Sequence, residues 1–401
     1  MPSDLARFWD LDPTITFLNH GSYGAAPRPV LEAQAAWRAR MEREPVAFFA
    51  HDLEPALDAA RDALGRFIGA DPDDLAFVHN ASTGIMTVLR SMRFAAGDEL
   101  LITDHAYNAA RNALDFVAEQ ADARIVEVQI PFPGTDVDAF VDTLLASVTS
   151  RTRLALVDHV TSPTALVLPI DRIVAELAER GVDTLVDGAH APGMIPLDLR
   201  SIGAAYYAGN CHKWLSAPKG SAFLHVQRDR QAHVRPLTIS HGANARRTDR
   251  SRFRLEFDWT GTDDPTAYLA VPDAIRFGEG LVAGGWSSLH ARDRDLAREA
   301  RDRICSVIGE PHPAPDEMLG SMVAVPISVE PPSAAVPLAT YADPWHAGLI
   351  DRGFQVPITP WPARRSGPWR RLVRVSLAPY NDRADVDALA EAIGQLHAAR
   401  A

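Results

Sequence analysis

The stretch GNCHKWLSAPKG, residues 209–220, contains the only two lysines of the chain, Lys213 and Lys219. Lysine and arginine together number 40, so every other basic residue is an arginine. Arginine replaces lysine easily on a solvated surface, but its guanidinium stays protonated and cannot supply a neutral primary amine. Usage alone leaves two explanations open: chance retention of both lysines, or amine chemistry at one of them.

Other reactive side chains follow short apolar runs that predict strands. Asn80-Ala81-Ser82-Thr83-Gly84 follows one such run, and Asp104, His105 and Tyr107 follow the next. Asp158 and His159 end a third run, and Asp187-Gly188-Ala189-His190 ends a fourth. Ligands of open α/β sheets bind at the carboxyl ends of the strands, so we expect these side chains to share one edge.

Each of these features has an ordinary structural explanation. Ser82 or Thr83 is typical of a helix cap, although a helix start with hydroxyls and free N–H groups also binds anions. Asp187, as a buried carboxylate, needs a partner, which is either a structural cation or a cationic ligand group. His105, Tyr107 and His190, taken singly, are more typical of packing than of catalysis.

Together, the features match the needs of pyridoxal phosphate (PLP). Its aldehyde requires an amine for a Schiff base, and its pyridine nitrogen requires a carboxylate to stay protonated. Its phosphate requires hydroxyl and N–H donors at a helix start. Lys213 is better placed than Lys219 to supply the amine, because it follows His212 and the strand-end motif of Asp187.

The elements that must position these residues alternate from about residue 54 to 230. The apolar spacing predicts helices over 54–70, 82–93, 106–121, 137–148, 170–181, 265–280, 287–307, 340–353 and 385–399. It predicts strands over 74–80, 98–104, 124–131, 153–159, 183–190, 221–226, 322–329 and 371–378. Strands alternating with helices indicate βαβ units and a mainly parallel, doubly covered sheet, followed by a smaller α+β domain. Asp385 is the predicted N-cap of the last helix.

The composition excludes several classes of protein. The net charge is −12 and is spread along the chain, which argues against a nucleic-acid surface. The basic pairs Arg246-Arg247 and Arg364-Arg365 are typical of solvated loops. Two cysteines exclude a disulfide framework and a multi-thiolate metal site, so we expect no metal. No signal peptide or membrane-spanning run is recognisable, and a cytoplasmic protein is the default expectation.

The chain resembles the class V aminotransferase family, PLP-dependent enzymes of fold type I. The motifs that carry the resemblance are Asn80-Ala81-Ser82-Thr83, Asp187-Gly188-Ala189-His190, Asn210-Cys211-His212-Lys213-Trp214, Gly261-Thr262, Arg374-Val375-Ser376 and Tyr380-Asn381. They occur in the family's order across most of the chain. FLNHGSYGAAPRPV (17–30) and EREPVAFF (42–49) are most similar to the isopenicillin N epimerase-like branch, which also contains carbon–sulfur lyases.

The resemblance implies a large PLP-binding domain over 16–269 and a small α+β domain formed by 1–15 and 270–401. It implies that Lys213 holds PLP and moves the Cα proton, while Asp187 pairs with the pyridine nitrogen. His190 would lie near the phenolic oxygen of the ring. His105 would stack on the ring, with Tyr107 as a second candidate.

The resemblance also implies the phosphate and substrate contacts. Ser82, Thr83 and His212 would bind the phosphate, and Asn210 is a further candidate, although relatives usually carry serine there. Thr262 would reach the phosphate of the neighbouring subunit, which implies a homodimer with active sites at the interface. Arg374 would bind the substrate α-carboxylate, a task suited to a planar bidentate donor. Asn19 and the backbone of His20-Gly21 would line the substrate entrance.

One departure from the family pattern reduces the number of candidate reactions. Class V cysteine desulfurases carry a nucleophilic cysteine upstream of the carboxylate-binding arginine, but residues 356–374 contain none. Persulfide chemistry of that type is therefore disfavoured. Epimerisation of an amino acid is the main expectation, and β-elimination by a C–S lyase and then transamination remain alternatives. A non-catalytic PLP-binding domain is disfavoured. The arginine-bearing loop PARRSGPWRR, residues 362–371, would suit a second substrate carboxylate, but a solvated basic loop is the favoured interpretation.

Overall fold

A seven-stranded sheet forms the centre of the computed structural model, which describes residues 3–134, 136–330, 341, 343–362 and 368–399. The strand order is β2-β8-β7-β6-β5-β3-β4. The strands are β2 (Leu75–Val78), β3 (Glu99–Thr103), β4 (Arg124–Val128), β5 (Thr152–Asp158), β6 (Asp183–Gly188), β7 (Tyr206–Asn210) and β8 (Ala222–Val226). Strand β8 pairs antiparallel with β2 and with β7, and the other neighbouring pairs of this sheet are parallel. The predicted parallel α/β fold is confirmed.

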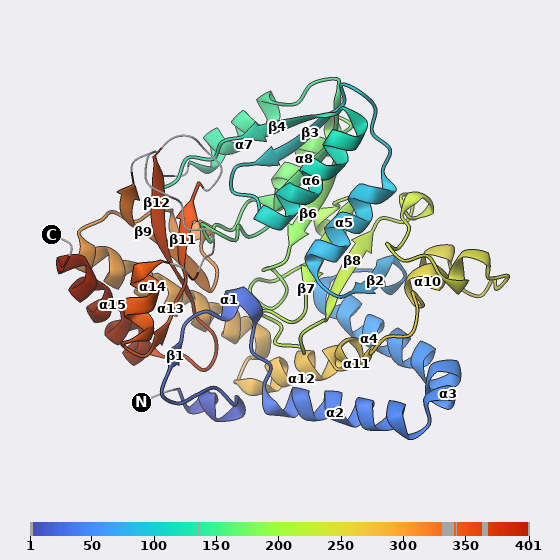
Figure 1. Cartoon of the computed structure of the whole chain (residues 1–401), viewed down its shortest axis with the longest axis horizontal. Helices are drawn as coiled ribbons and strands as arrows, with labels where there is room; N and C mark the ends of the chain where they lie inside the picture. Colours follow the sequence, from blue (N-terminus) through green and yellow to red (C-terminus); the bar gives the residue numbers. More distant parts are fainter. Residues whose placement is uncertain (1–2, 135, 331–340, 342, 363–367, 400–401) are drawn as a thin grey trace.

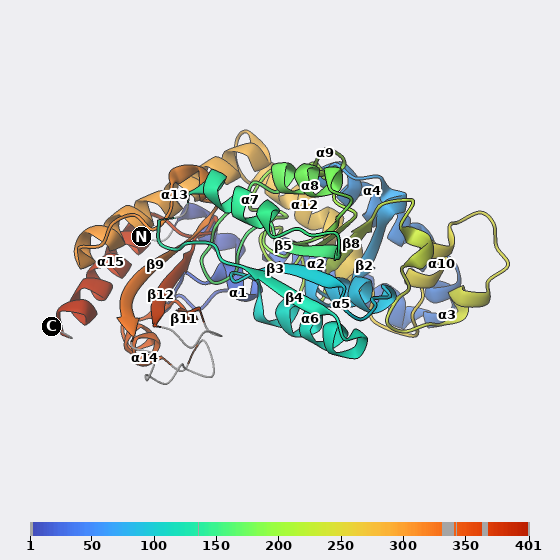
Figure 2. The same cartoon turned by 90° about the horizontal axis from the view of Figure 1, so that it is seen from above.

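Helices cover both faces of this sheet (Figure 2). The helices α5 (Ala81–Ser91) and α6 (Asn108–Ala121) pack on one face. On the other face lie α4 (Leu53–Ile68), α7 (Val137–Ala146) and α8 (Ile170–Glu179). Every residue of β3 is buried, as expected for an apolar strand enclosed by two helical layers.

A second, smaller unit contains an antiparallel sheet in the order β11-β12-β9 (Figure 1). Its strands are β9 (Met322–Glu330), β11 (Ile358–Trp361) and β12 (Trp369–Ser376). The helices of this unit are α13 (Gly285–Ile308), α14 (Pro344–Ile350) and α15 (Arg383–Ala398). They share one apolar core with the strands, separate from the two cores that flank the large sheet.

The N-terminal residues connect the two units. The short strand β1 (Thr16–Phe17) pairs with β10 (Phe354–Gln355) of the smaller unit. The chain then forms α1 (His20–Tyr23) and α2 (Arg28–Arg43), which runs under the large unit (Figure 1). The predicted domain limits stay a prediction, although the pairing of β1 places residues 16–17 with the smaller unit.

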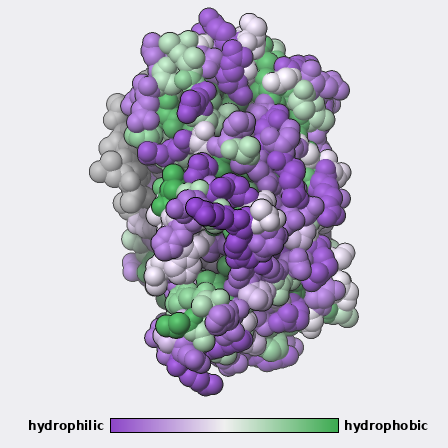
Figure 3. All heavy atoms as spheres, turned by 90° about the vertical axis from the view of Figure 1, so that its right-hand side faces the viewer, coloured by the Kyte–Doolittle hydropathy of each residue, from purple (hydrophilic) through white to green (hydrophobic). Residues whose placement is uncertain are grey.

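The remaining helices are mostly short and lie in the connections between these elements. They are η1 (Asp4–Phe8), α3 (Pro45–Ala47), η2 (Phe48–Asp52), η3 (Pro72–Asp74), α9 (Leu199–Ile202), η4 (Gln231–His233), η5 (His241–Asn244), α10 (Arg252–Phe257), α11 (Thr266–Leu269), α12 (Val271–Leu281) and η6 (Asp316–Met318). The face at the α3–α10 end is mostly hydrophilic with small hydrophobic areas between (Figure 3). Among the described residues, no helix combines the length and apolarity that a membrane span needs.

Several predicted elements need correction. The helix predicted over 265–280 is two helices, α11 and α12, and Pro272 lies in the first turn of α12. The helix predicted over 340–353 is the shorter α14, and residues 340 and 342 lie outside the described residues. The sequence did not predict α2, β7 or β11.

The predicted N-cap of the last helix is also wrong. Asp382, not Asp385, caps α15, and its side chain accepts a hydrogen bond from the Asp385 N–H. Asp385 returns a hydrogen bond to the Asp382 N–H and completes a capping box.

We predict that Asp382→Ala lowers the free energy of unfolding by about 1 kcal/mol, because the first turn of α15 loses its side-chain acceptor. Urea unfolding followed by circular dichroism measures the difference. Asp387→Ala, which removes an exposed carboxylate paired with Arg303, is the control and should change stability less. Equal effects of both substitutions would contradict the assigned cap.

Candidate active site

The candidate site lies at the carboxyl ends of β5, β6 and β7. Asp158 and Asp187 are the facing residues of β5 and β6, and Lys213 follows β7 by three residues. The start of α5 closes the site on one side, because Asn210 at the end of β7 accepts a hydrogen bond from the Ala81 N–H at 2.8 Å. Strand β12 contributes Arg374 from the smaller unit.

Lys213 contacts His190 in a way that favours a neutral amine. Its Nζ lies 3.1 Å from His190 Nε2. The indole N–H of Trp214 donates to His190 Nδ1 at 3.2 Å, so the neutral imidazole carries its proton on Nε2. That proton points toward Lys213, and only an unprotonated amine accepts it.

Burial and the nearby charges also favour the neutral form of the Lys213 amine. Withdrawal from water and the nearby Arg374 guanidinium lower the pKa of Lys213 to about 7, while Asp187 opposes the change. Burial, together with Lys213 and Arg374, holds the pKa of His190 well below its usual value. The amine is therefore available as a nucleophile near neutral pH.

Asp187 and Asp158 form a buried pair of carboxylates, each with 3% exposure. Burial raises the pKa of Asp187, opposed by the Ala189 N–H, which donates to its Oδ1 at 3.0 Å, and by Lys213. Burial and repulsion from Asp187 raise the pKa of Asp158 well above its usual value. Because burial disfavours the anionic form of Asp187, a cationic guest such as a protonated pyridine nitrogen would stabilise that form.

The start of α5 offers donors for an anion. Asn80 caps the helix by accepting from the Thr83 N–H at 2.8 Å, and Asn210 uses its Oδ1 for Ala81. The amide and hydroxyl of Ser82 lie outside these two caps. His212 donates from Nδ1 to the Ser221 carbonyl oxygen at 2.9 Å, leaving Nε2 for a ligand. Burial lowers the pKa of His212 to about 4, an effect that a bound phosphate would oppose.

Arg374 is buried, with 5% exposure, and is only partly satisfied by the protein. Its Nη1 donates to the Ser162 carbonyl oxygen at 2.8 Å, and its Nη2 donates to Ser22 Oγ at 2.8 Å. Its Nε is buried without a hydrogen-bond partner among the described residues. A carboxylate ligand would satisfy this orphaned donor.

The two candidates for the ring face differ in exposure and in their contacts. His105 has no exposed surface, and both of its ring nitrogens are used, by Thr164 Oγ1 at 2.6 Å and the Ile130 carbonyl oxygen at 2.9 Å. Tyr107 is 43% exposed and lies close enough to Arg374 to influence its pKa. Which of the two stacks on the ring stays a prediction.

The two predicted N-terminal residues, Asn19 and His20, are buried, and their place at the substrate entrance stays a prediction. Asn19 Nδ2 donates to the Tyr341 hydroxyl at 3.2 Å. Tyr341 and Ser22 belong to the surroundings of Arg374, and sequence reasoning did not identify either of them. Both Ser22 and its partner Tyr341 are far from Arg374 or from each other in the sequence, so only the folded structure shows these contacts. Ser22 belongs to the predicted entrance segment, but no motif marks it as a site residue.

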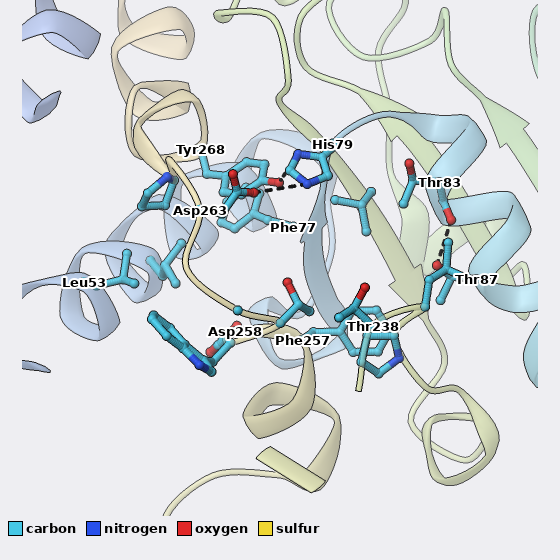
Figure 4. A pocket seen from close by; sticks show the side chains of 18 of the residues that line it. Leu53, Phe77, His79, Thr83, Thr87, Thr238, Phe257, Asp258, Asp263 and Tyr268 are labelled. Atoms are coloured by element: carbon cyan, nitrogen blue, oxygen red, sulfur yellow. Dashed lines mark hydrogen bonds and ion pairs between the residues drawn. The ribbon is translucent and has the colours of Figure 1, made fainter. Parts of the chain in front are cut away.

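Thr262 lies on an exposed loop. The loop borders a pocket of about 140 Å³ whose wall also includes Thr83 of α5 (Figure 4). His79 holds the loop by contacts with Asp263 at 3.2 Å and with the Tyr268 hydroxyl at 3.2 Å. The role of Thr262 at the phosphate of a neighbouring subunit stays a prediction.

The donor set fits PLP. The amine of Lys213 suits the aldehyde, Asp187 suits the ring nitrogen, and the start of α5 suits the phosphate. Both cysteines, Cys211 and Cys305, are buried, and burial raises the pKa of each thiol, so neither is a reactive thiolate. Within the described residues, no group of His, Cys, Asp and Glu side chains could hold a metal ion.

We predict that the Lys213 amine reacts with a small aldehyde in the cofactor-free protein increasingly as the pH rises through about 7 and then levels off. The reason is that the neutral form, which is the nucleophile, predominates above the pKa. Borohydride trapping followed by mass spectrometry measures the modified fraction at each pH. A rise only near pH 10, the range of an ordinary lysine, would contradict the described surroundings.

Comparisons with known proteins agree with this arrangement. The chain is 38% identical over 400 residues to isopenicillin N epimerase of Amycolatopsis lactamdurans, with 96% of each chain covered. It is 30% identical over 429 residues to putative L-cysteine desulfhydrase 2 of Oryza sativa subsp. japonica, covering 98% of this chain and 86% of that protein.

A solved structure of C-DES with glycine covalently linked to its PLP cofactor has the same fold. Its TM-score is 0.77 at 19% sequence identity, with 95% of this chain and 97% of that chain covered. The family described as Aminotransferase class-V matches residues 25–389, which include Lys213, Asp187 and Arg374. The chain belongs to the class V aminotransferase family.

Proposed function

We propose that this chain is a PLP-dependent enzyme that acts at Cα of an amino-acid substrate, and that its reaction is epimerisation. The observation that carries the proposal is the grouping of Lys213, Asp187 and Arg374 in a chain similar to isopenicillin N epimerase along almost its whole length. PLP, when bound, supplies an electron sink that weakens the bonds to Cα.

Each residue of the group has a defined task in this proposal. Lys213 holds the cofactor through its amine and afterwards takes the Cα proton, for which a pKa of about 7 is well matched. Asp187 would pair with the ring nitrogen. Arg374 orients the substrate by its α-carboxylate, using the Nε that has no hydrogen-bond partner among the described residues.

Epimerisation also needs a proton donor on the face opposite Lys213. His105 is enclosed and uses both ring nitrogens, whereas the Tyr107 hydroxyl is the accessible candidate. The Tyr107 N–H is anchored by the Asp158 carboxylate, which fixes the turn that carries the phenol. We therefore assign the second proton transfer to Tyr107.

A homodimer is part of the proposal. Thr262 would reach the phosphate at the neighbouring subunit's site, and its exposure on the loop beside the α5 pocket is compatible with that task. The chain would then build each phosphate site from two subunits. Analytical ultracentrifugation tests the dimer, and weaker PLP binding by Thr262→Ala would support the shared site.

β-Elimination on a cysteine-derived substrate is the second candidate. The observation that favours it is the similarity to putative L-cysteine desulfhydrase 2, which covers nearly all of this chain. Both reactions begin with the same Lys213 proton transfer and differ in whether a β-substituent leaves. Persulfide transfer of the desulfurase type is disfavoured, because both thiols of the chain are buried.

Incubation of the PLP-loaded protein with candidate amino acids in D₂O tests the reaction. We predict deuterium at Cα together with loss of optical activity. Pyruvate and a released thiol would instead establish β-elimination, and a keto acid with stoichiometric pyridoxamine phosphate would establish transamination. Lys213→Arg is the control and should abolish turnover, because guanidinium cannot replace the amine.

We predict that Tyr107→Phe slows formation of the opposite enantiomer by about 100-fold, in the range expected for loss of a general acid. Exchange of the Cα proton through Lys213 should be affected less, because that amine is on the other face. Chiral chromatography and proton NMR in D₂O measure the two rates side by side. Equal slowing of both rates would contradict the assignment of Tyr107.

A further inference from the structure

We propose that residues 19–24, here called the clamp segment, fix the position of Lys213 relative to Arg374, with His20 as the central positioning residue. The inference rests on the proposed function, because it assigns the amine and the carboxylate-binding guanidinium to those two residues. The contacts of the clamp segment explain how the Lys213 amine and the Arg374 guanidinium are held at a fixed distance from each other.

The first contact joins the clamp segment to the backbone of Lys213. His20 is 1% exposed, and its Nε2 lies 3.0 Å from the Lys213 carbonyl oxygen. A carbonyl oxygen only accepts, so Nε2 carries the proton. Nδ1 then accepts from the Tyr380 hydroxyl at 2.8 Å, which fixes this tautomer. Burial lowers the pKa of His20 to about 4, so the ring is neutral at physiological pH.

The second contact joins the end of the clamp segment to both sides of Lys213. Gly24 has a φ of +69°, and a Cβ placed there would lie 1.9 Å from the His212 carbonyl oxygen. The two backbones therefore touch, and only glycine fits. Lys219 Nζ donates to the Gly24 carbonyl oxygen at 3.1 Å. The second lysine of the chain thus holds the clamp segment against the loop that carries the first.

The third contact joins the clamp segment to Arg374. Ser22 Oγ accepts from Arg374 Nη2 at 2.8 Å and donates to Asn19 Oδ1 at 2.6 Å. Asn19 also forms a backbone bridge with Ser376, two residues beyond Arg374 on β12. Contacts to the Lys213 loop, from His20 and Gly24, therefore alternate along these six residues with contacts to β12, from Asn19 and Ser22.

This connection matters because Lys213 and Arg374 come from different sheets. The large sheet carries Lys213, whereas β12 of the smaller sheet carries Arg374. The amino group and carboxylate of an amino acid are attached to one carbon, so the two binding groups must be held to within about 0.5 Å. The clamp segment bridges the two sheets at the place where this spacing is needed.

A matched pair of substitutions separates the His20 hydrogen bond from packing. The amide nitrogen of glutamine in His20→Gln reaches the place of Nε2 and still donates to the Lys213 carbonyl. Asparagine in His20→Asn reaches only the place of Nδ1 and loses that donor. The first readout is hydrogen exchange of residues 212–220 in the cofactor-free protein. It includes the Ser216 N–H, which donates to the same carbonyl at 2.9 Å.

We predict that His20→Asn raises exchange of residues 212–220 by about tenfold, whereas His20→Gln stays close to the unsubstituted protein. In the loaded enzyme, His20→Asn should lower kcat more than it raises KM, because Lys213 rather than Arg374 is displaced. The exchange measurement does not depend on any reaction, so it remains valid even if the proposed epimerisation is wrong.

Equal exchange in both His20 variants would overturn the role of the hydrogen bond, because packing volume would then be the cause. Lys219→Met and Lys219→Arg provide a second pair that does not alter the buried core. Loss of the donor in Lys219→Met should raise exchange of residues 17–25, and Lys219→Arg, which keeps a donor, should not. Unchanged exchange in Lys219→Met would overturn the clamp.

Discussion

The contact between the Lys213 amine and the neutral His190 imidazole is the interaction on which the site depends. Trp214 fixes the His190 tautomer, and that tautomer presents a proton that only a neutral amine accepts. The same interior lowers the pKa of Lys213 to about 7. An ordinary lysine would be protonated at neutral pH and inert as a nucleophile. The arrangement thus provides the amine in its reactive form before any ligand binds.

The buried polar groups around Lys213 indicate which ligand this interior would select. Burial disfavours the anionic forms of Asp187 and Asp158, and Arg374 has a donor without a partner among the described residues. A ligand that carries a cationic ring nitrogen and an anionic carboxylate satisfies both deficits together. The site also depends on both sheets, since the smaller unit supplies Arg374 and the N-terminal residues connect it to the Lys213 loop.

Much of the fold was predictable from the sequence, because apolar runs and helical spacing mark most strands and helices of the large unit. Strand β7 was not predicted, since its residues Tyr206–Asn210 mix aromatic, small and polar types although all are buried. Helix α15 was predicted, but its cap was placed one turn late, because Asp382 and Asp385 both suit the position and only their reciprocal hydrogen bonds distinguish them.

The site was partly predictable, because some of its residues are recognisable from their type and position in the sequence. Lys213, Asp187 and Arg374 stand out by residue type and position, whereas Ser22 and Tyr341 act through contacts across hundreds of residues. The choice between His105 and Tyr107 depends on the turn after β3, which no periodicity specifies. Lys219 is explained only by its contact with Gly24, 195 residues earlier.

The central claim is that one amine, that of Lys213, forms the covalent link to the cofactor. Borohydride reduction of the PLP-loaded protein, followed by peptide mapping, tests it directly, because the chain offers only two lysines. We expect the reduced adduct on the peptide that contains Lys213 and none on Lys219. An adduct on Lys219, or no adduct in protein that binds PLP, would contradict the account.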